Sequence, residues 1–178
     1  ARFVRFFVYW NDPERVDVDL HSAGVREDGK TFRIGWNANF RDLGIVSSGD
    51  ITHSDAAEYV DVDLTSPIRQ VIFNIHLFFG RPDFNSIQTC FAGLMAVKKN
   101  GEEVRLYDPA NCFVTHRLRQ KCRTISYGYL DVQNRELVFI GQPIDDADDW
   151  YDSSRTPTLS RMNVAHYLDL LLEVGVRD

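Results

Sequence analysis

The chain has 178 residues, 44% of them hydrophobic and 26% charged, which is the composition of one globular domain with a substantial core. Its net charge of −6 argues against general nucleic-acid binding, because that function usually needs a basic surface. No stretch is apolar over the length that spans a bilayer, and no secretory signal is visible. Cys90, Cys112 and Cys122 are odd in number and lack metal-ligand spacing, which favours reduced thiols in a cytosolic protein.

Short runs of strand-forming residues, separated by turn signals, extend to about residue 140. Hydrophobic and polar side chains alternate within these runs, and Asp28-Gly29 and Asn100-Gly101 are typical hairpin turns. One face of the most hydrophobic run is interrupted by the polar residues Asn74 and His76. Strands are predicted at residues 2–10, 16–20, 31–36, 44–48, 60–64, 71–79, 87–97, 104–107, 113–123, 126–132 and 136–140.

The end of the chain has a different character. Residues 145–155 are acidic and irregular, and apolar residues then recur at helical spacing to about residue 174. This helix either packs on the strands or is held out for a partner, and we predict packing. The resulting fold class is all-β: an antiparallel β-sandwich of about ten short strands at 1–144, an acidic linker at 145–155, and a C-terminal amphipathic helix at 156–178.

Acidic residues follow an unusual pattern. The sequence Val-Asp-Val-Asp-Leu occurs twice, at residues 16–20 and 60–64, and alternation directs its aspartates away from the core. Between the two copies, Asp50, Asp55 and Glu58 are predicted to lie on a loop. Calcium takes six to eight oxygen ligands, often from such loops, although the spacing does not match an EF-hand. The two interpretations are a cation site and charged strand faces that meet water or pair with arginine.

The two acidic strands, the Asp-Gly turn, the segment Ser48-Gly49-Asp50-Ile51-Thr52 and Glu58 together resemble the TerD tellurium-resistance and stress-response domain. The resemblance covers roughly residues 3–143 and implies a cytoplasmic bacterial β-sandwich that binds calcium. The family's loop usually reads Gly-Asp-Asn, then glycines, then Asp-Asp-Glu, whereas this chain has Ile51 and Ala56-Ala57. Weak calcium binding, or none, is therefore predicted. Carried over by position, the implied metal ligands are Asp17, Asp19, Asp50, Asp55 and Glu58.

We predict a non-enzymatic module that acts by contacting a protein partner, because no Ser-His-Asp order, cysteine nucleophile or phosphate-binding glycine loop is visible. One alternative is a metal-free interaction domain, and a less favoured one is a hydrolase that uses two carboxylates. A second candidate site is a basic row at period two, which either binds phosphate or an acidic partner or is a solvated face. The row consists of Arg117, Arg119, Lys121 and Arg123, with His116 beside it.

Overall fold

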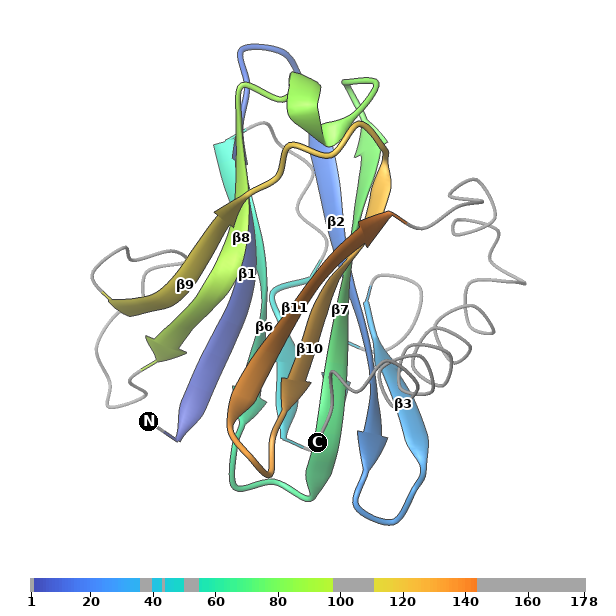
Figure 1. The fold of residues 1–178 in the computed structure, drawn as a ribbon, viewed down its shortest axis with the longest axis vertical. Coiled ribbons are helices and arrows are strands. Elements are labelled where there is room, and N and C mark those ends of the chain that lie inside the picture. Colours follow the sequence, from blue (N-terminus) through green and yellow to red (C-terminus); the bar gives the residue numbers. More distant parts are fainter. Residues whose placement is uncertain (1, 36–39, 43, 50–54, 98–110, 144–178) are drawn as a thin grey trace.

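The computed structural model describes residues 2–35, 40–42, 44–49, 55–97 and 111–143. These residues form eleven strands in two antiparallel sheets, together with one short 3-10 helix (Figure 1). The predicted all-β sandwich is thereby confirmed. The predicted strand at 104–107, the linker at 145–155 and the helix at 156–178 lie outside the described residues.

The first sheet has the strand order β4-β5-β6-β1-β8-β9. Strand β1 lies near its centre and pairs antiparallel with β6 on one side and β8 on the other. Both faces of β1 are largely apolar because both are buried: Phe6 and Val8 face the core, and Phe7 is buried on the outer face. The bounds are β1 Phe3–Asn11, β4 Arg41–Asp42, β5 Ile45–Ser47, β6 Asp55–Asp63, β8 Thr89–Val97 and β9 Cys112–Arg117.

The second sheet has the strand order β11-β10-β7-β2-β3. The predicted Asp28-Gly29 turn joins β2 to β3, and Gly29 has the positive φ of 86° that such a tight turn favours. The strands predicted at 126–132 and 136–140 correspond to β10 and β11, which pair as a hairpin. The bounds are β2 Asp17–Arg26, β3 Thr31–Ile34, β7 Ile68–Phe79, β10 Thr124–Asp131 and β11 Glu136–Pro143, and the 3-10 helix η1 spans Phe84–Ser86.

The hydrophobic core lies between the two sheets. Phe6 of β1 stacks on Phe73 of β7, with ring centroids 4.0 Å apart, and Tyr127 of β10 packs against Phe6 at 4.8 Å. All three side chains are fully buried, as is Trp10, whose indole N–H donates to the Val16 carbonyl. Burial of aromatic rings of this size is the main stabilising contribution expected for such a domain.

Several elements differ from the sequence-based prediction. Strand β2 continues to Arg26, beyond the predicted end at residue 20, and the short strand β4 was not predicted. Strand β6 begins at Asp55, so Glu58 lies on a strand and not on a loop, because β1 continues to Asn11 and offers pairing as far as Asp55. The strand predicted at 113–123 ends at Arg117, because its partner β8 begins only two residues beyond the Phe91–Arg117 pair.

Asp12 ties together three segments at one end of the sandwich. Its carboxylate accepts hydrogen bonds from the backbone N–H of Glu14 at 2.9 Å and of Gln88 at 3.0 Å, and from the Arg81 guanidinium at 3.0 Å. The Asp12 side chain is fully buried, while that of Arg81 is 30% exposed. The hydrogen bonds from Arg81 and the two amides lower the pKa of Asp12 to about 2, against its burial.

We therefore predict that Asp12→Asn destabilises the protein at pH 7 by about 2 kcal/mol. The substitution removes the negative charge of a buried group that accepts several hydrogen bonds. The stabilisation is fully present above the unfolded-state pKa of about 4 and disappears as the pH falls through about 2. Urea unfolding of wild type and variant at several pH values measures it. Asp28→Asn, at an exposed turn, is the matched control, and a pH-independent difference for Asp12→Asn would contradict the assignment.

Candidate functional site

The structure places three of the five predicted calcium ligands, Asp17, Asp19 and Glu58, around the start of β2. Asp17 and Asp19 alternate with the core residue Val18, so they lie on the outer face of the second sheet, as predicted. They are not exposed to water, however, since each is only 5% accessible. Glu58 shares the inward side of β6 with core valines and is 4% accessible.

Glu58 reaches across from the first sheet to the second. Its Oε2 accepts the backbone N–H of Leu20 at 2.8 Å, which brings this carboxylate to the amide adjoining Asp19. The β2 backbone lies between Glu58 and the two aspartates, because they occupy opposite faces of that strand. Asp50 and the side chain of Asp55 lie outside the described residues.

The predicted ligand set is thus brought together only in part. In the described portions of the chain, no group of three or more His, Cys, Asp or Glu side chains is arranged to hold a metal ion. The five-residue calcium set stays a prediction, with Asp17, Asp19 and Glu58 gathered around one segment of β2 as its described portion.

A buried polar layer extends from Asp19 across the outer face of the second sheet. The strand register places Asp19 opposite His76 of β7, and His76 opposite Thr124 of β10. The imidazole Nδ1 of His76 lies 2.5 Å from the Thr124 hydroxyl oxygen. The next cross-strand row is also polar and fully buried, and consists of His21, Asn74 and Ser126.

This polar layer was not predicted from the sequence. The one indication of it in the sequence is that Asn74 and His76 occur two residues apart on the most hydrophobic strand. Alternation locates these side chains on the outer face, but only the strand order shows that β2 and β10 contribute polar residues beside them.

Burial, with a smaller contribution from the charge of Arg123, lowers the pKa of His76 to about 3. The imidazole is therefore neutral at physiological pH. A neutral imidazole has one donor and one acceptor nitrogen, which suits the contact with the Thr124 hydroxyl.

We predict that acid destabilises the protein through His76. In the unfolded chain the His76 imidazole is protonated near pH 6.5, whereas in the folded chain it stays neutral down to about pH 3. Stability is thus fully retained above pH 6.5 and falls as the pH drops, by at most about 1.4 kcal/mol per pH unit.

His76→Gln should flatten this dependence between about pH 6.5 and 4, since glutamine can replace the hydrogen bond but does not titrate. Chemical denaturation from pH 4 to 8 measures the slopes. Thr124→Val is the matched control, because it removes the hydrogen bond and leaves the imidazole. Equal slopes for wild type and His76→Gln would refute the role given to His76.

The second Val-Asp-Val-Asp-Leu copy is neutralised by arginine, as one sequence-based interpretation allowed. Asp61 forms a bidentate pair with Arg5 at 2.7 and 2.9 Å, and both side chains are about 95% buried on the outer face of the first sheet. The Arg5 guanidinium also lies 3.5 Å from the ring centre of Tyr59. The positive charge and the two N–H donors of Arg5 satisfy the buried Asp61 carboxylate, and stacking on Tyr59 supports the guanidinium.

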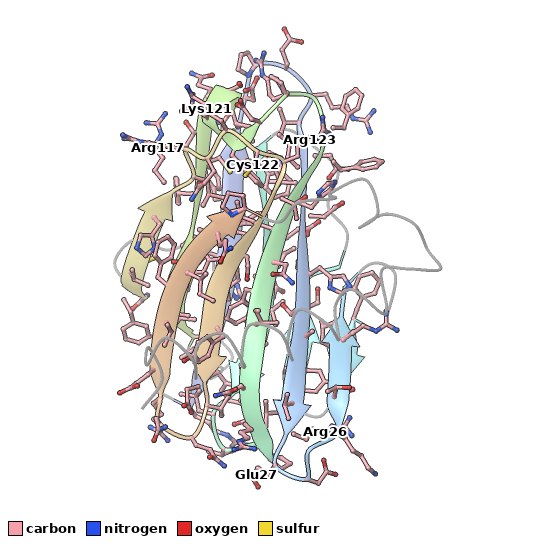
Figure 2. The ribbon with its side chains drawn as sticks, turned by 45° about the vertical axis from the view of Figure 1, so that its right-hand side comes forward. Arg26, Glu27, Arg117, Lys121, Cys122 and Arg123 are labelled. Atoms are coloured by element: carbon pink, nitrogen blue, oxygen red, sulfur yellow. The ribbon has the colours of Figure 1, made fainter. Side chains whose placement is uncertain are left out.

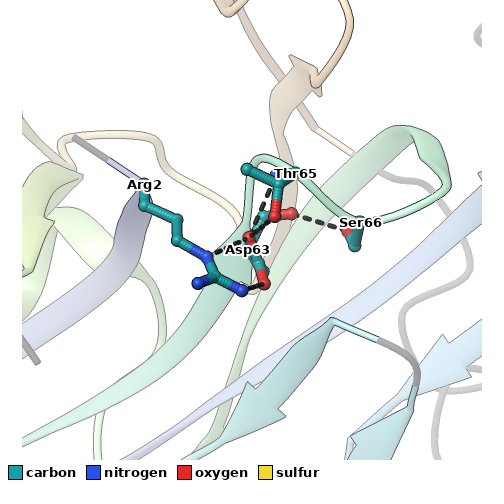
Figure 3. A network of polar contacts seen from close by, with 4 residues as sticks. All are labelled: Arg2, Asp63, Thr65 and Ser66. Carbon is teal, nitrogen blue, oxygen red and sulfur yellow. Dashed lines mark hydrogen bonds and ion pairs between the residues drawn. The ribbon is translucent and has the colours of Figure 1, made fainter.

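Asp63 pairs with Arg2 in a more open setting (Figure 3). The Arg2 side chain is 63% exposed, and the Asp63 carboxylate also accepts bonds from the N–H and hydroxyl of Thr65. Its backbone carbonyl accepts the Ser66 hydroxyl at 2.6 Å. The hydrogen bonds from Arg2 and Thr65 lower the pKa of Asp63 to about 2.

We predict that Arg5→Met costs about 3–5 kcal/mol, because it leaves the Asp61 charge buried without its arginine. Arg2→Met should cost much less than Arg5→Met, since its pair is exposed and screened by water. The double variant Arg5→Met/Asp61→Leu should recover most of the loss. Denaturant unfolding of all three variants tests this, and equal costs for the two methionine variants would contradict it.

The predicted basic row does not form one strand face. Arg117 ends β9, while Arg119, Lys121 and Arg123 follow in an irregular segment. Arg123 donates to the carbonyl oxygens of Leu77 and Phe78, and Figure 2 shows it apart from Arg117 and Lys121. Arg117 donates instead to the Gln88 carbonyl oxygen at 3.4 Å. The row is therefore divided among side chains with separate surroundings. The three cysteines are free thiols, and burial strongly raises the pKa of Cys90.

An apolar pocket of about 480 Å³ opens between the edge strands β9 and β11. Its polar lining residues are His116 and Arg135, and its lining contains no carboxylate. A smaller pocket of about 240 Å³ is lined by Asp42, Asp61 and Asp63. Each of these three carboxylates forms an ion pair with an arginine.

The sequence matches no known protein-family profile, no curated protein and no solved structure. The TerD resemblance therefore stays a prediction. Among the helices of the described residues, none has the length and apolarity needed to cross a membrane.

Proposed function

We propose that this chain is a TerD-like stress-response module of the bacterial cytoplasm, which binds calcium weakly and acts through a protein partner without catalysis. The observation that carries the proposal is the gathering of three carboxylates, each at most 5% exposed, around the start of β2. Burying like charges together is costly unless positive charge compensates them. Calcium is one source of that charge, and its preference for oxygen ligands suits carboxylates.

The two remaining predicted ligands, Asp50 and Asp55, precede Glu58 in the sequence. Calcium held by them together with Glu58, with Asp17 and Asp19 in support on the other face of β2, would fix the segment between β5 and β6. It would thereby change the surface that this end of the sandwich offers to a partner. The departures from the family's loop at Ile51 and Ala56-Ala57 reduce the number of oxygen ligands, which is why weak affinity is proposed.

The main alternative is an interaction domain without metal, in which positively charged side chains compensate the same carboxylates. The hydrolase alternative is less favoured, because the three aspartates of the smaller pocket are paired with arginine. The low pKa of Asp63, caused by Arg2, also removes it as a proton donor at neutral pH.

We predict that calcium raises the melting temperature of chelator-treated protein and gives a saturable heat of binding. At a free concentration one hundred times Kd, binding contributes about 2.7 kcal/mol. For a chain of this length, that corresponds to a shift of roughly 5–10 °C. Isothermal titration and thermal unfolding at millimolar calcium measure the two quantities.

Asp19→Asn and Glu58→Gln should abolish both responses without unfolding the protein, since they keep shape and remove charge. Asp28→Asn, at an exposed turn distant in sequence from the cluster, should leave both responses unchanged. Absence of heat and of any melting shift in wild type would remove calcium from the proposal and leave the metal-free interaction domain.

A further inference from the structure

The pocket between β9 and β11 lies at one edge of the sandwich, where the two sheets leave an opening between their side chains. Leu94 and Val114 line it from the first sheet, and Leu130 and Leu137 from the second. The volume of about 480 Å³ falls within the range of small-molecule sites. The apolar residues that line the pocket are thus continuous with the hydrophobic core, and the pocket opens at one edge of the sandwich.

The aromatic wall of the pocket is held in place by contacts within the protein. The His116 ring stacks on Phe139 with centroids 4.1 Å apart, and its Nδ1 lies 2.6 Å from the hydroxyl oxygen of fully buried Tyr127. Phe139 also meets Tyr127 edge to face at 5.2 Å. Side chains fixed in this way give a preformed surface, so a ligand pays little to order it.

Large apolar side chains are exposed beside this wall. Phe113 is 64% exposed and Phe139 is 45% exposed, and both line the pocket. They leave flat apolar surface at the opening, which an apolar ligand would cover.

Arg135 supplies the charge of the pocket. It lies on the turn between β10 and β11 with a positive φ of 55°, and it makes none of the ion pairs found among the described residues. In a protein of net charge −6, an anion is attracted to this position by the local arginine and not by the overall field.

We propose that this pocket binds a small amphipathic anion, with its apolar body between the two sheets and its anionic group at Arg135. The enclosure by two sheets of one chain favours a small molecule. The site is distinct from the acidic start of β2 and independent of calcium.

The probes are 8-anilinonaphthalene-1-sulfonate, whose fluorescence rises in apolar sites, and decanoate with its neutral analogue decanol. We expect saturable binding of the fluorescent probe by the folded protein, displacement by decanoate, and weaker displacement by decanol. Saturating calcium or chelator should not alter these results. Failure of decanoate to displace the probe would overturn the proposal.

Three variants locate the site. Val114→Trp and Leu137→Trp fill the pocket from opposite sheets, and each should weaken decanoate binding at least tenfold while its melting transition shows that it is folded. Arg135→Asn should weaken decanoate about fivefold and leave decanol unchanged, as for a solvent-exposed ion pair. Asparagine tolerates the positive φ, so this variant should fold.

Arg119→Asn is the matched control, because Arg119 is an exposed arginine that does not line the pocket. It should bind decanoate as wild type does. Unchanged binding in both folded tryptophan variants would place the ligand elsewhere, and equal effects of Arg135→Asn on decanoate and decanol would refute the role of Arg135.

Discussion

The packing of two apolar sheet faces against each other is the constraint on which the rest of this structure depends. The stack of Phe6 on Phe73 joins the sheets at their centre, and the surrounding valines, leucines and isoleucines exclude water between them. Once this layer is formed, period-two alternation sends nearly every charged side chain of the strands to an outer face or an edge. Glu58 is the exception, since it points inward and is satisfied by the Leu20 backbone N–H of the opposite sheet.

Charge compensation then decides what each acidic residue can do. Asp61 pairs with Arg5 and Asp63 pairs with Arg2, so both aspartates stabilise the fold. Asp17, Asp19 and Glu58 instead gather around the start of β2, where the cross-strand neighbour His76 is neutral. The two copies of one pentapeptide thus differ in their described surroundings: the second pairs with Arg5 and Arg2, whereas in the first Asp19 lies opposite the neutral His76.

The two candidate sites lie in different parts of the sandwich. The acidic cluster lies where β2 and β6 approach each other, on the side of β3 and β5, whereas the apolar pocket lies between β9 and β11 (Figure 1). The pocket is lined mainly from β1, β8, β9, β10 and β11, and none of these strands carries a residue of the acidic cluster. Independent binding at the two sites is therefore the simplest expectation.

Much of the fold could be predicted from sequence, because alternation and turn residues are local signals. They gave the strands, the Asp28-Gly29 hairpin and the outward direction of Asp17 and Asp19. Local signals could not give strand order, so they failed where pairing decides the outcome: the extension of β6 through Glu58, the end of β9 at Arg117, and the buried row of Asp19, His76 and Thr124. The alternation of residues along each strand already shows which of its sides is apolar. Which carboxylates meet arginine, which are buried near one another and where the two sheets leave a pocket follow from the folded structure alone, because these features depend on contacts between residues far apart in the chain.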